Sequence, residues 1–293
     1  KFIPLSEESF KEMHYKASKD VLTNYYNNFP ESDLLTGKGL VVGGSHSVNN
    51  LNEEIQFGDL SALLMHNSPF WGQWLRTPEL KIALMDEWEG KIEELARSTI
   101  HENVTSIAGV PTWTIILIKR ILELSGKNKL IEVWPHLELY LHGGVSFTPY
   151  REQFRELVGA DINYLEMYNA SEGFFAAQNM PNDDGMLLFT DHGIFYEFMP
   201  VEEYGSENPQ TVGLKDVEKD KNYAIVISTN GGLWRYLVGD TVKFTSTRPF
   251  KIVVTGRLKY FINAFGEELI ADNAEKAIAK AAELTNTVVN DYT

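Results

Sequence analysis

The apolar pattern of this chain changes near Glu172, and this change limits the fold more than any other feature of the sequence. Before it, segments with helical spacing alternate with short apolar runs, which is typical of a sheet covered by helices. After it, short apolar runs follow one another between turn sequences, which is typical of antiparallel β structure. We therefore expect an α/β part followed by a β-rich part, and the length of 293 residues is enough for about two domains.

Helix starts in the first part are marked by capping residues and prolines. A serine followed by acidic residues, or a proline in the first turn, is typical of a helix N-terminus. Gly126 and Gly159 are expected to end the third and fourth of these helices. The helix at Pro78 is expected to have Leu80, Ala83, Leu84 and Trp88 on its apolar side. The predicted starts are Ser6, Pro78, Pro111 and Thr148-Pro149.

Strands of the β-rich part are expected between turn sequences such as Asn230-Gly231-Gly232. A new segment begins at Gly256 and is predicted to contain a strand, a turn at Gly266 and a helix over 271–284, so we place a boundary at 256–259. The expected strands are 186–190, 194–199, 224–228, 233–238, 242–245 and 252–255.

Composition and charge exclude several classes of protein. The chain has 26 Lys and Arg against 41 Asp and Glu, a net charge of −15, which disfavours binding to nucleic acid phosphates. It has no cysteine, so disulfides and thiolate chemistry are excluded. No apolar run approaches the roughly 20 residues that span a bilayer, and no signal peptide is visible. We expect a soluble, cytoplasmic protein without a membrane partner, and a chain that begins at Lys1 looks like an internal fragment.

The hexapeptide Tyr168–Gly173 directly follows a predicted strand, and ligands of α/β sheets usually bind at the carboxyl ends of strands. A tyrosine ring can stack on a purine, the hydroxyl of Ser171 suits a phosphate, and the carboxylate of Glu172 suits Mg²⁺. Taken alone, however, the hexapeptide is more typical of an ordinary turn with a surface carboxylate.

Two further segments of the second half suit a nucleotide, although each, taken alone, is more typical of a turn. In Tyr236–Asp240, we expect Asp240 at a strand end, where its carboxylate can accept two hydrogen bonds from a ribose diol and Gly239 lets the backbone approach. In Gly256–Lys259, the Arg257 guanidinium offers donors for ribose or phosphate. In the first half, 104–112 reads as a strand that ends at a proline-started helix.

These segments occur in a fixed order, and in that order they resemble the acyl-adenylate-forming superfamily. More closely, the chain resembles a bacterial-type member of the auxin-responsive promoter family of acyl acid amido synthetases. The segments that carry the resemblance are Lys1–Ser6, Val104–Thr112, His142-Gly143-Gly144, Tyr168–Gly173, Tyr236–Asp240 and Gly256–Lys259.

The resemblance implies an α/β fold with sheet layers, a small β-barrel-like subdomain and the start of a C-terminal α+β lid. In these terms residues 1–173 are the α/β part, 174–255 the barrel-like part, and 256–293 the hinge and first piece of the lid. The family's phosphate loop would precede Lys1 and most of its lid would follow Thr293. We therefore expect these residues by themselves to catalyse adenylation poorly or not at all.

The resemblance also implies roles for individual residues, with ATP and Mg²⁺ as the bound groups. Tyr168 would stack on adenine, and Ser171 and Glu172 would act in catalysis, the first on phosphate and the second on Mg²⁺. An apolar acyl group would be lined by Val110, Trp113 and Phe174, an assignment that rests on position alone. The remaining roles are Gly143, Gly144 and Val145 beside the adenine, Asp240 on the ribose hydroxyls, Arg257 on ribose or phosphate, and Lys259 as hinge.

The implied activity is ATP-dependent formation of an acyl adenylate from a small carboxylic acid, followed by transfer to an amine, most naturally an amino acid. Two alternatives stay open on the sequence. One is an acyl-CoA ligase of the same superfamily, with a thiol as acceptor. The other is a non-catalytic module that keeps the fold and binds a nucleotide or acyl group.

Overall fold

The computed structural model describes residues 2–43, 48–52, 55–258, 262–264, 267–269, 271–285 and 287. Contacts divide the chain into two compact units. The α/β unit comprises Phe29–Leu165 with Thr287–Thr293, and the β-rich unit comprises Lys1–Asn28 with Glu166–Asn286. The β-rich unit thus takes its first helices from the start of the chain and its strands from the second half. The predicted division at residues 173 and 255 stays a prediction.

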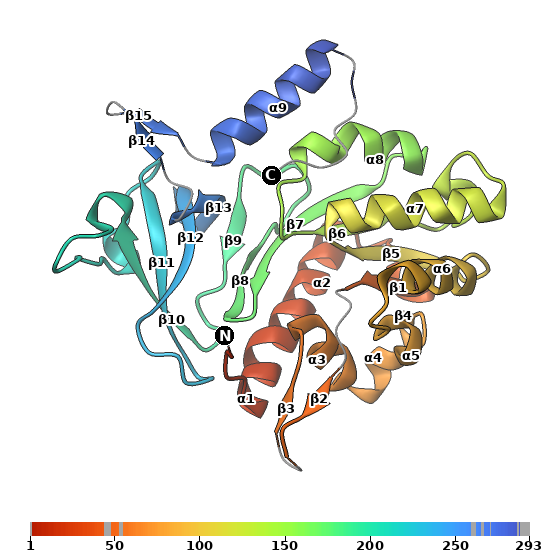
Figure 1. Ribbon diagram of the computed structural model, residues 1–293, viewed down its shortest axis with the longest axis horizontal. Coiled ribbons are helices and arrows are strands. Elements are labelled where there is room, and N and C mark those ends of the chain that lie inside the picture. The colour runs from red at the N-terminus through yellow and green to blue at the C-terminus, as the bar shows by residue number, and fades with distance from the viewer. Residues whose placement is uncertain are drawn as a thin grey trace. The chain divides into compact units, whose positions relative to one another are not determined.

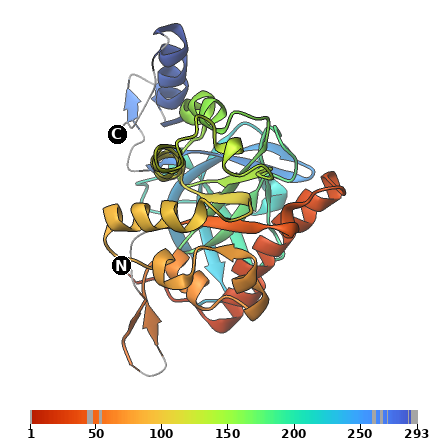
Figure 2. The ribbon, with the colours of Figure 1, turned by 90° about the vertical axis from the view of Figure 1, so that its right-hand side faces the viewer.

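The α/β unit contains a parallel sheet with the strand order β6-β5-β1-β4. A separate hairpin of β2 and β3 projects from the body of this unit (Figures 1 and 2). The strands are β1 (Lys38–Val42), β2 (Asn49–Asn50), β3 (Gln56–Phe57), β4 (Arg76–Thr77), β5 (Val104–Gly109) and β6 (Leu139–His142). The helices are α3 (Leu60–His66), α4 (Phe70–Trp74), α5 (Leu80–Ala83), α6 (Trp88–Thr99), α7 (Pro111–Ser125) and α8 (Arg151–Val158), with short 3₁₀ turns at Leu34–Thr36, Leu130–Glu132 and Thr148–Tyr150.

Local signals set both ends of α7 and the C-terminal end of α8 as predicted, whereas Thr148-Pro149 begins a 3₁₀ turn and α8 follows it from Arg151. Pro111 occupies the first turn of α7, and Gly126 ends that helix with a left-handed φ of 66°. Gly159 ends α8 in the same way, with a φ of 76°. A residue with a Cβ is strained at such angles, which is why glycine is found after helix C-termini. The buried faces of α6 and α7 join one apolar cluster with the strands, which includes Leu40, Leu95, Ile107, Ile118, Tyr140 and Phe154.

The helix expected at Pro78 is wrong in its start and in its length. The short helix α5 begins at Leu80, after Glu79 at its N-cap, and Trp88 belongs to the separate helix α6. The side chain of Glu87 caps α6 by accepting a hydrogen bond from the backbone N–H of Glu89 at 2.9 Å. This carboxylate cap starts a new helix where apolar spacing alone predicts continuity.

The β-rich unit begins with a continuous helical segment. It consists of α1 (Glu7–Ser9), a π-helical turn (Phe10–Tyr15) and α2 (Lys16–Asn28). The predicted cap is confirmed, because the Ser6 hydroxyl accepts a hydrogen bond from the backbone N–H of Ser9 at 3.1 Å. Met13 of the π-helical turn is buried in the same apolar cluster as the strands of this unit.

The strands of the β-rich unit are antiparallel, in the order β10-β11-β12-β13-β9-β8-β7 (Figure 1). Their apolar cluster includes Phe175, Phe198, Ile225, Val242 and Phe244. The strands are β7 (Asn163–Ala170), β8 (Gly173–Ala177), β9 (Met186–Leu188), β10 (Ile194–Pro200), β11 (Asn222–Thr229), β12 (Tyr236–Thr247) and β13 (Phe250–Arg257), with 3₁₀ turns at Val201–Glu203 and Leu214–Asp216. A second hairpin pairs β14 (Ile262–Ala264) with β15 (Glu267–Leu269), and α9 (Ala271–Thr285) follows it.

Two strand predictions need correction. The expected strands over 233–238 and 242–245 form the single strand β12, because Gly239, with a φ of 96°, produces a bulge within the strand and not a hairpin turn. Strand β8 was missing from the expected set, because its run Gly173–Ala177 has no turn sequence before it apart from Ser171-Glu172. All five residues of β8 are buried, so no polar alternation marks it.

Candidate nucleotide site

A two-residue turn carries Ser171 and Glu172. Strands β7 and β8 pair as far as Ala170 and Gly173, so only Ser171 and Glu172 connect them. Gly173 is packed closely, because a Cβ at this position would lie 2.9 Å from Ile194 Cδ1 and from Phe175 Cε1. Any larger residue at 173 would push the turn away from β10, so the glycine fixes where the Glu172 side chain begins.

The Glu172 carboxylate is held by a tyrosine from another strand. The Tyr236 hydroxyl, at the start of β12, donates a hydrogen bond to Glu172 Oε1 at 3.0 Å. Within the described ranges, Oε2 has no hydrogen-bond partner, and the side chain is half-buried. One oxygen of this carboxylate is therefore committed to the protein and the other is available to a ligand.

Asp240 accepts two polar contacts on its two oxygens. The Tyr168 hydroxyl donates to Oδ2 at 2.9 Å, and Arg257 Nε forms an ion pair with Oδ1 at 3.0 Å. Asp240 and Arg257 face each other across the β12–β13 pairing, which explains the ion pair. The Asp240 side chain is 14% exposed, whereas that of Arg257 is 68% exposed, so the pair is open to solvent on the arginine side and contributes little by itself.

Both carboxylates act on the same hydroxyl. Burial raises the pKa of Tyr168 well above its usual range, and the negative charges of Asp240 and Glu172 shift it in the same direction. The hydroxyl therefore stays protonated and serves as a donor. Only 7% of the Tyr168 surface is exposed, and its ring centroid lies 4.8 Å from that of Phe175. The structure thus brings together three stretches that the sequence analysis assigns to one nucleotide.

Asp240 does not lie at a strand end, as the sequence predicts, but at a bulge inside β12. Strand β11 pairs through Val226 with Leu237 and through Ala224 with Thr241. Between these pairs β12 has three residues and β11 has one, so β12 bulges at 238–240. Bulges re-aim side chains and are over-represented beside active sites, and this one carries the residue proposed to bind ribose.

The Gly143-Gly144 turn of the α/β unit lies at the carboxyl end of β6. Gly144 has a φ of 83°, and a Cβ there would lie 3.3 Å from Val110 Cγ2, so the turn and the start of α7 are close together. Val145, which follows this turn, is exposed. The ring of Trp113 packs on that of Trp88, with centroids 5.3 Å apart.

Of two further predicted site residues, Phe174 and Lys259, the structure describes only the first. Phe174 belongs to the β-rich unit, where it is buried and contacts Phe189 with ring centroids 5.7 Å apart. Lys259, the expected hinge residue, lies outside the described residues. The roles of these residues stay predictions.

His142 precedes the Gly143-Gly144 turn and is buried. Its ring stacks on Phe147 with centroids 4.3 Å apart, and within the part of the chain that the structure describes Nδ1 has no hydrogen-bond partner. Burial lowers the pKa of His142 to about 3, and the positive charge of Arg151 acts in the same direction. The imidazole is therefore neutral at physiological pH.

The neutral imidazole of His142 predicts a pH dependence of stability. In the unfolded chain histidine takes up a proton below about pH 6.5, whereas the folded side chain does so only near pH 3. The unfolded state therefore binds more protons as the pH falls between these values, and the free energy of unfolding decreases. Urea unfolding at pH 7.5 and 5.5 should show about 1 kcal/mol more loss for the wild type than for His142→Phe. Equal losses in the two proteins would contradict this interpretation, and the same substitution at exposed His136 serves as the control.

Among the described residues, no group of three or more His, Asp or Glu side chains could hold a metal ion by itself. The Glu172 carboxylate offers one uncommitted oxygen, which fits an ion that takes most of its ligands from phosphates and water, as Mg²⁺ does. This donor set is compatible with Mg²⁺ bound together with a nucleotide.

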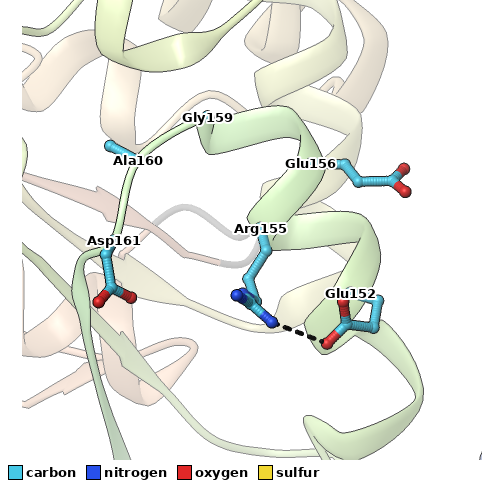
Figure 3. Close-up of a pocket in the computed structure, with 6 residues that line it drawn as sticks. All are labelled: Glu152, Arg155, Glu156, Gly159, Ala160 and Asp161. Atoms are coloured by element: carbon cyan, nitrogen blue, oxygen red, sulfur yellow. Dashed lines mark hydrogen bonds and ion pairs between the residues drawn. The ribbon is translucent and has the colours of Figure 1, made fainter.

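A surface pocket of the α/β unit lies beside the C-terminal end of α8 (Figure 3). Its three carboxylates outnumber its single guanidinium, and Arg155 is paired with Glu152 at 3.3 Å. Such a charge disfavours an anionic nucleotide. None of the residues assigned to the nucleotide lines this pocket, which is formed by Glu152, Arg155, Glu156, Gly159, Ala160 and Asp161.

Sequence reasoning missed the role of Tyr236. The residue lies within the segment Tyr236–Asp240, for which the sequence predicts roles for Gly239 and Asp240 but none for the tyrosine. The signal that could have found it is its place in the same segment as Asp240, the residue predicted to bind ribose.

Solved structures show that the fold is that of the adenylate-forming enzymes. The GH3.15 acyl acid amido synthetase in complex with 2,4-DB matches with a TM-score of 0.78 at 17% identity, covering 100% of this chain and 60% of that chain. ATP-bound MatB from Rhodopseudomonas palustris matches with a TM-score of 0.51 at 14% identity, covering 94% and 48%. The expected α/β fold class is confirmed, and at these identities the likeness concerns the fold alone.

Two models of one protein family match most of the chain. Residues 1–162 match the GH3 family N-terminal domain, and residues 187–257 match the GH3 family central domain. The chain belongs to the GH3 family. This is the auxin-responsive family that the motifs resemble, so the predicted family is confirmed.

Two plant enzymes illustrate the relationship. Indole-3-acetic acid-amido synthetase GH3.3 of Arabidopsis thaliana is 26% identical over 193 residues, which is 58% of this chain and 32% of that protein. Jasmonoyl-L-amino acid synthetase JAR4 of Nicotiana attenuata is 28% identical over 171 residues, which is 55% and 28%. The matched part is thus about a third of the length of these relatives.

In the described part of the chain, no helix combines the length and apolar character needed to cross a bilayer.

Proposed function

We propose that the intact protein containing these residues is an ATP-dependent ligase that joins a carboxylic acid to an amine of the amino acid class. The observation that carries the proposal is the cluster of Tyr168, Glu172, Tyr236 and Asp240 within a GH3 family chain. The relatives, an indole-3-acetic acid-amido synthetase and a jasmonoyl-L-amino acid synthetase, support the amine as acceptor. We place the reaction in the cytoplasm, where ATP and amino acids are available.

In the first step, a carboxylate oxygen of the acid attacks the α-phosphorus of ATP, the bond to the bridging oxygen of the β-phosphate breaks, and pyrophosphate leaves. The acyl adenylate remains. Asp240, fixed by Tyr168 and Arg257, accepts hydrogen bonds from the ribose hydroxyls. The chain contributes positioning and charge, which are the usual sources of rate enhancement in phosphoryl chemistry.

Mg²⁺ would be held by Glu172 with the phosphates and would supply neutralisation of the charge that develops on pyrophosphate. Ser171, next to it in the turn, is exposed and would donate a hydrogen bond to a phosphate oxygen. In the second step, the amine nitrogen attacks the acyl carbon, AMP leaves, and the proton of the amine passes to solvent.

ATP–pyrophosphate exchange measured with a panel of carboxylic acids tests the proposal. We expect the intact protein to catalyse exchange in the presence of at least one of these acids, because exchange reports the reversal of adenylate formation. Absence of exchange with every acid, together with absence of ATP binding, would overturn it. Mass spectrometry of the products, with CoA and amino acids both present, separates the amide-forming reaction from the acyl-CoA alternative. A structural neighbour, 2-hydroxyisobutyryl-CoA ligase, is named for that alternative.

A further inference from the structure

The start of β12 is built to hold Tyr236 in one place. Tyr236 pairs with Ile227 of β11 and packs against the apolar cluster of the β-rich unit. The preceding residue, Arg235, has a left-handed φ of 43°, which is strained for a residue with a Cβ. Both Nε and Nη2 of Arg235 donate to the carboxylate of Glu197 at 3.0 Å, and this bidentate pair connects the start of β12 to β10.

Glu172, in contrast, begins in a short turn and has a flexible side chain. A glutamate that is free to rotate distributes its carboxylate over several rotamers, and ordering it on ligand binding costs free energy. The hydrogen bond from Tyr236 to Oε1 removes this freedom before any ligand arrives. It also determines which oxygen is left for the ligand, because Oε1 already accepts from the hydroxyl.

We propose that Tyr236 is a positioning residue, whose hydroxyl holds the Glu172 carboxylate so that Oε2 faces the Mg²⁺ that arrives with ATP. This inference rests on the proposed function. Partners that orient a metal-binding carboxylate commonly influence metal affinity by a factor of ten or more, although they do not touch the metal. Tyr236 makes no contact with the nucleotide in this assignment, so its effect passes through Glu172.

The test is a double-mutant cycle on Mg²⁺-dependent ATP binding, measured by calorimetry with a non-hydrolysable ATP analogue on the intact protein. For each variant the ratio of the affinity in Mg²⁺ to the affinity in EDTA is determined. Tyr236→Phe should lower this ratio about tenfold and leave the affinity in EDTA unchanged. Glu172→Gln should lower the ratio at least as much, and Tyr236→Phe should have no further effect in that background.

Tyr223→Phe provides the matched control. Tyr223 lies on β11 of the same unit, and its hydroxyl accepts a hydrogen bond from the backbone N–H of Glu218 at 3.0 Å. This substitution also removes one tyrosine hydroxyl with one hydrogen bond, and it should leave the Mg²⁺ ratio at the wild-type value.

Each outcome decides one question. A ratio that is unchanged in Tyr236→Phe, or effects of Tyr236→Phe and Glu172→Gln that simply add, would overturn the positioning role while ATP binding by the wild type upholds the proposed function. A wild type that binds no ATP would overturn the proposed function and this inference together.

Discussion

Replacement of Glu172 by alanine is expected to reduce ATP–pyrophosphate exchange of the intact protein by about 10²–10³-fold. The reason is the loss of the only carboxylate in the described β7–β8 turn, whose free oxygen is assigned to Mg²⁺. The fold should persist, because Glu172 is half-buried and its one described hydrogen bond goes to a tyrosine hydroxyl at the edge of the site.

Two companion variants sharpen this prediction. Glu172→Gln keeps an oxygen that can accept from Tyr236 but removes the charge, so it should lose nearly as much exchange activity as the alanine variant. Glu152→Ala on α8 removes an exposed carboxylate with a single ion pair to Arg155 and should leave exchange unchanged. Exchange within threefold of wild type in Glu172→Ala would show that this carboxylate has no part in the reaction.

The second large effect is expected at Asp240, where stability and nucleotide binding can be separated. Asp240→Ala leaves the buried Tyr168 hydroxyl without its acceptor, which should lower the free energy of unfolding by about 1–3 kcal/mol. It also removes the group assigned to the ribose hydroxyls, and ATP affinity should fall by about 10–100-fold, as expected for the loss of a charged acceptor worth about 1.5–3 kcal/mol.

The double variant Tyr168→Phe with Asp240→Ala distinguishes the two effects. Because neither partner of the hydrogen bond remains, most of the lost stability should return, whereas ATP affinity should stay low. Urea unfolding and calorimetric titration with ATP provide the two measurements. Recovery of ATP affinity together with stability would mean that Asp240 acts on the fold and not on the nucleotide.

Much of the fold could be predicted from local signals. Pro111 with Gly126, and Thr148-Pro149 with Gly159, mark α7 and α8 because a fixed φ at the start and a left-handed φ at the end are properties of single residues. The error at Pro78 came from a competing signal, the Glu87 cap, which divides one apolar stripe into two helices. Strand β12 was divided in the prediction because Gly239-Asp240 is typical of a turn, and only the pairing with β11 and β13 shows that the strand continues.

For the site too, local segments predict the residue types but not the contacts between residues far apart in the sequence. The residue types of Glu172 and Asp240 could be read from their segments, and the order of the segments indicated the family. The partners of these carboxylates could not be read, because Tyr236 reaches Glu172 across 64 positions and Tyr168 reaches Asp240 across 72. Such contacts depend on the register in which β12 pairs with β11 across the bulge at 238–240, and no short segment encodes that register.

The central claim is that these side chains serve one nucleotide, and a crystal structure of the intact protein with Mg²⁺ and a non-hydrolysable ATP analogue tests it most directly. The account predicts ribose hydroxyls within hydrogen-bond distance of the Asp240 carboxylate and a metal ion bound to Glu172 Oε2, with Oε1 still accepting from Tyr236. A nucleotide bound away from both carboxylates would contradict it.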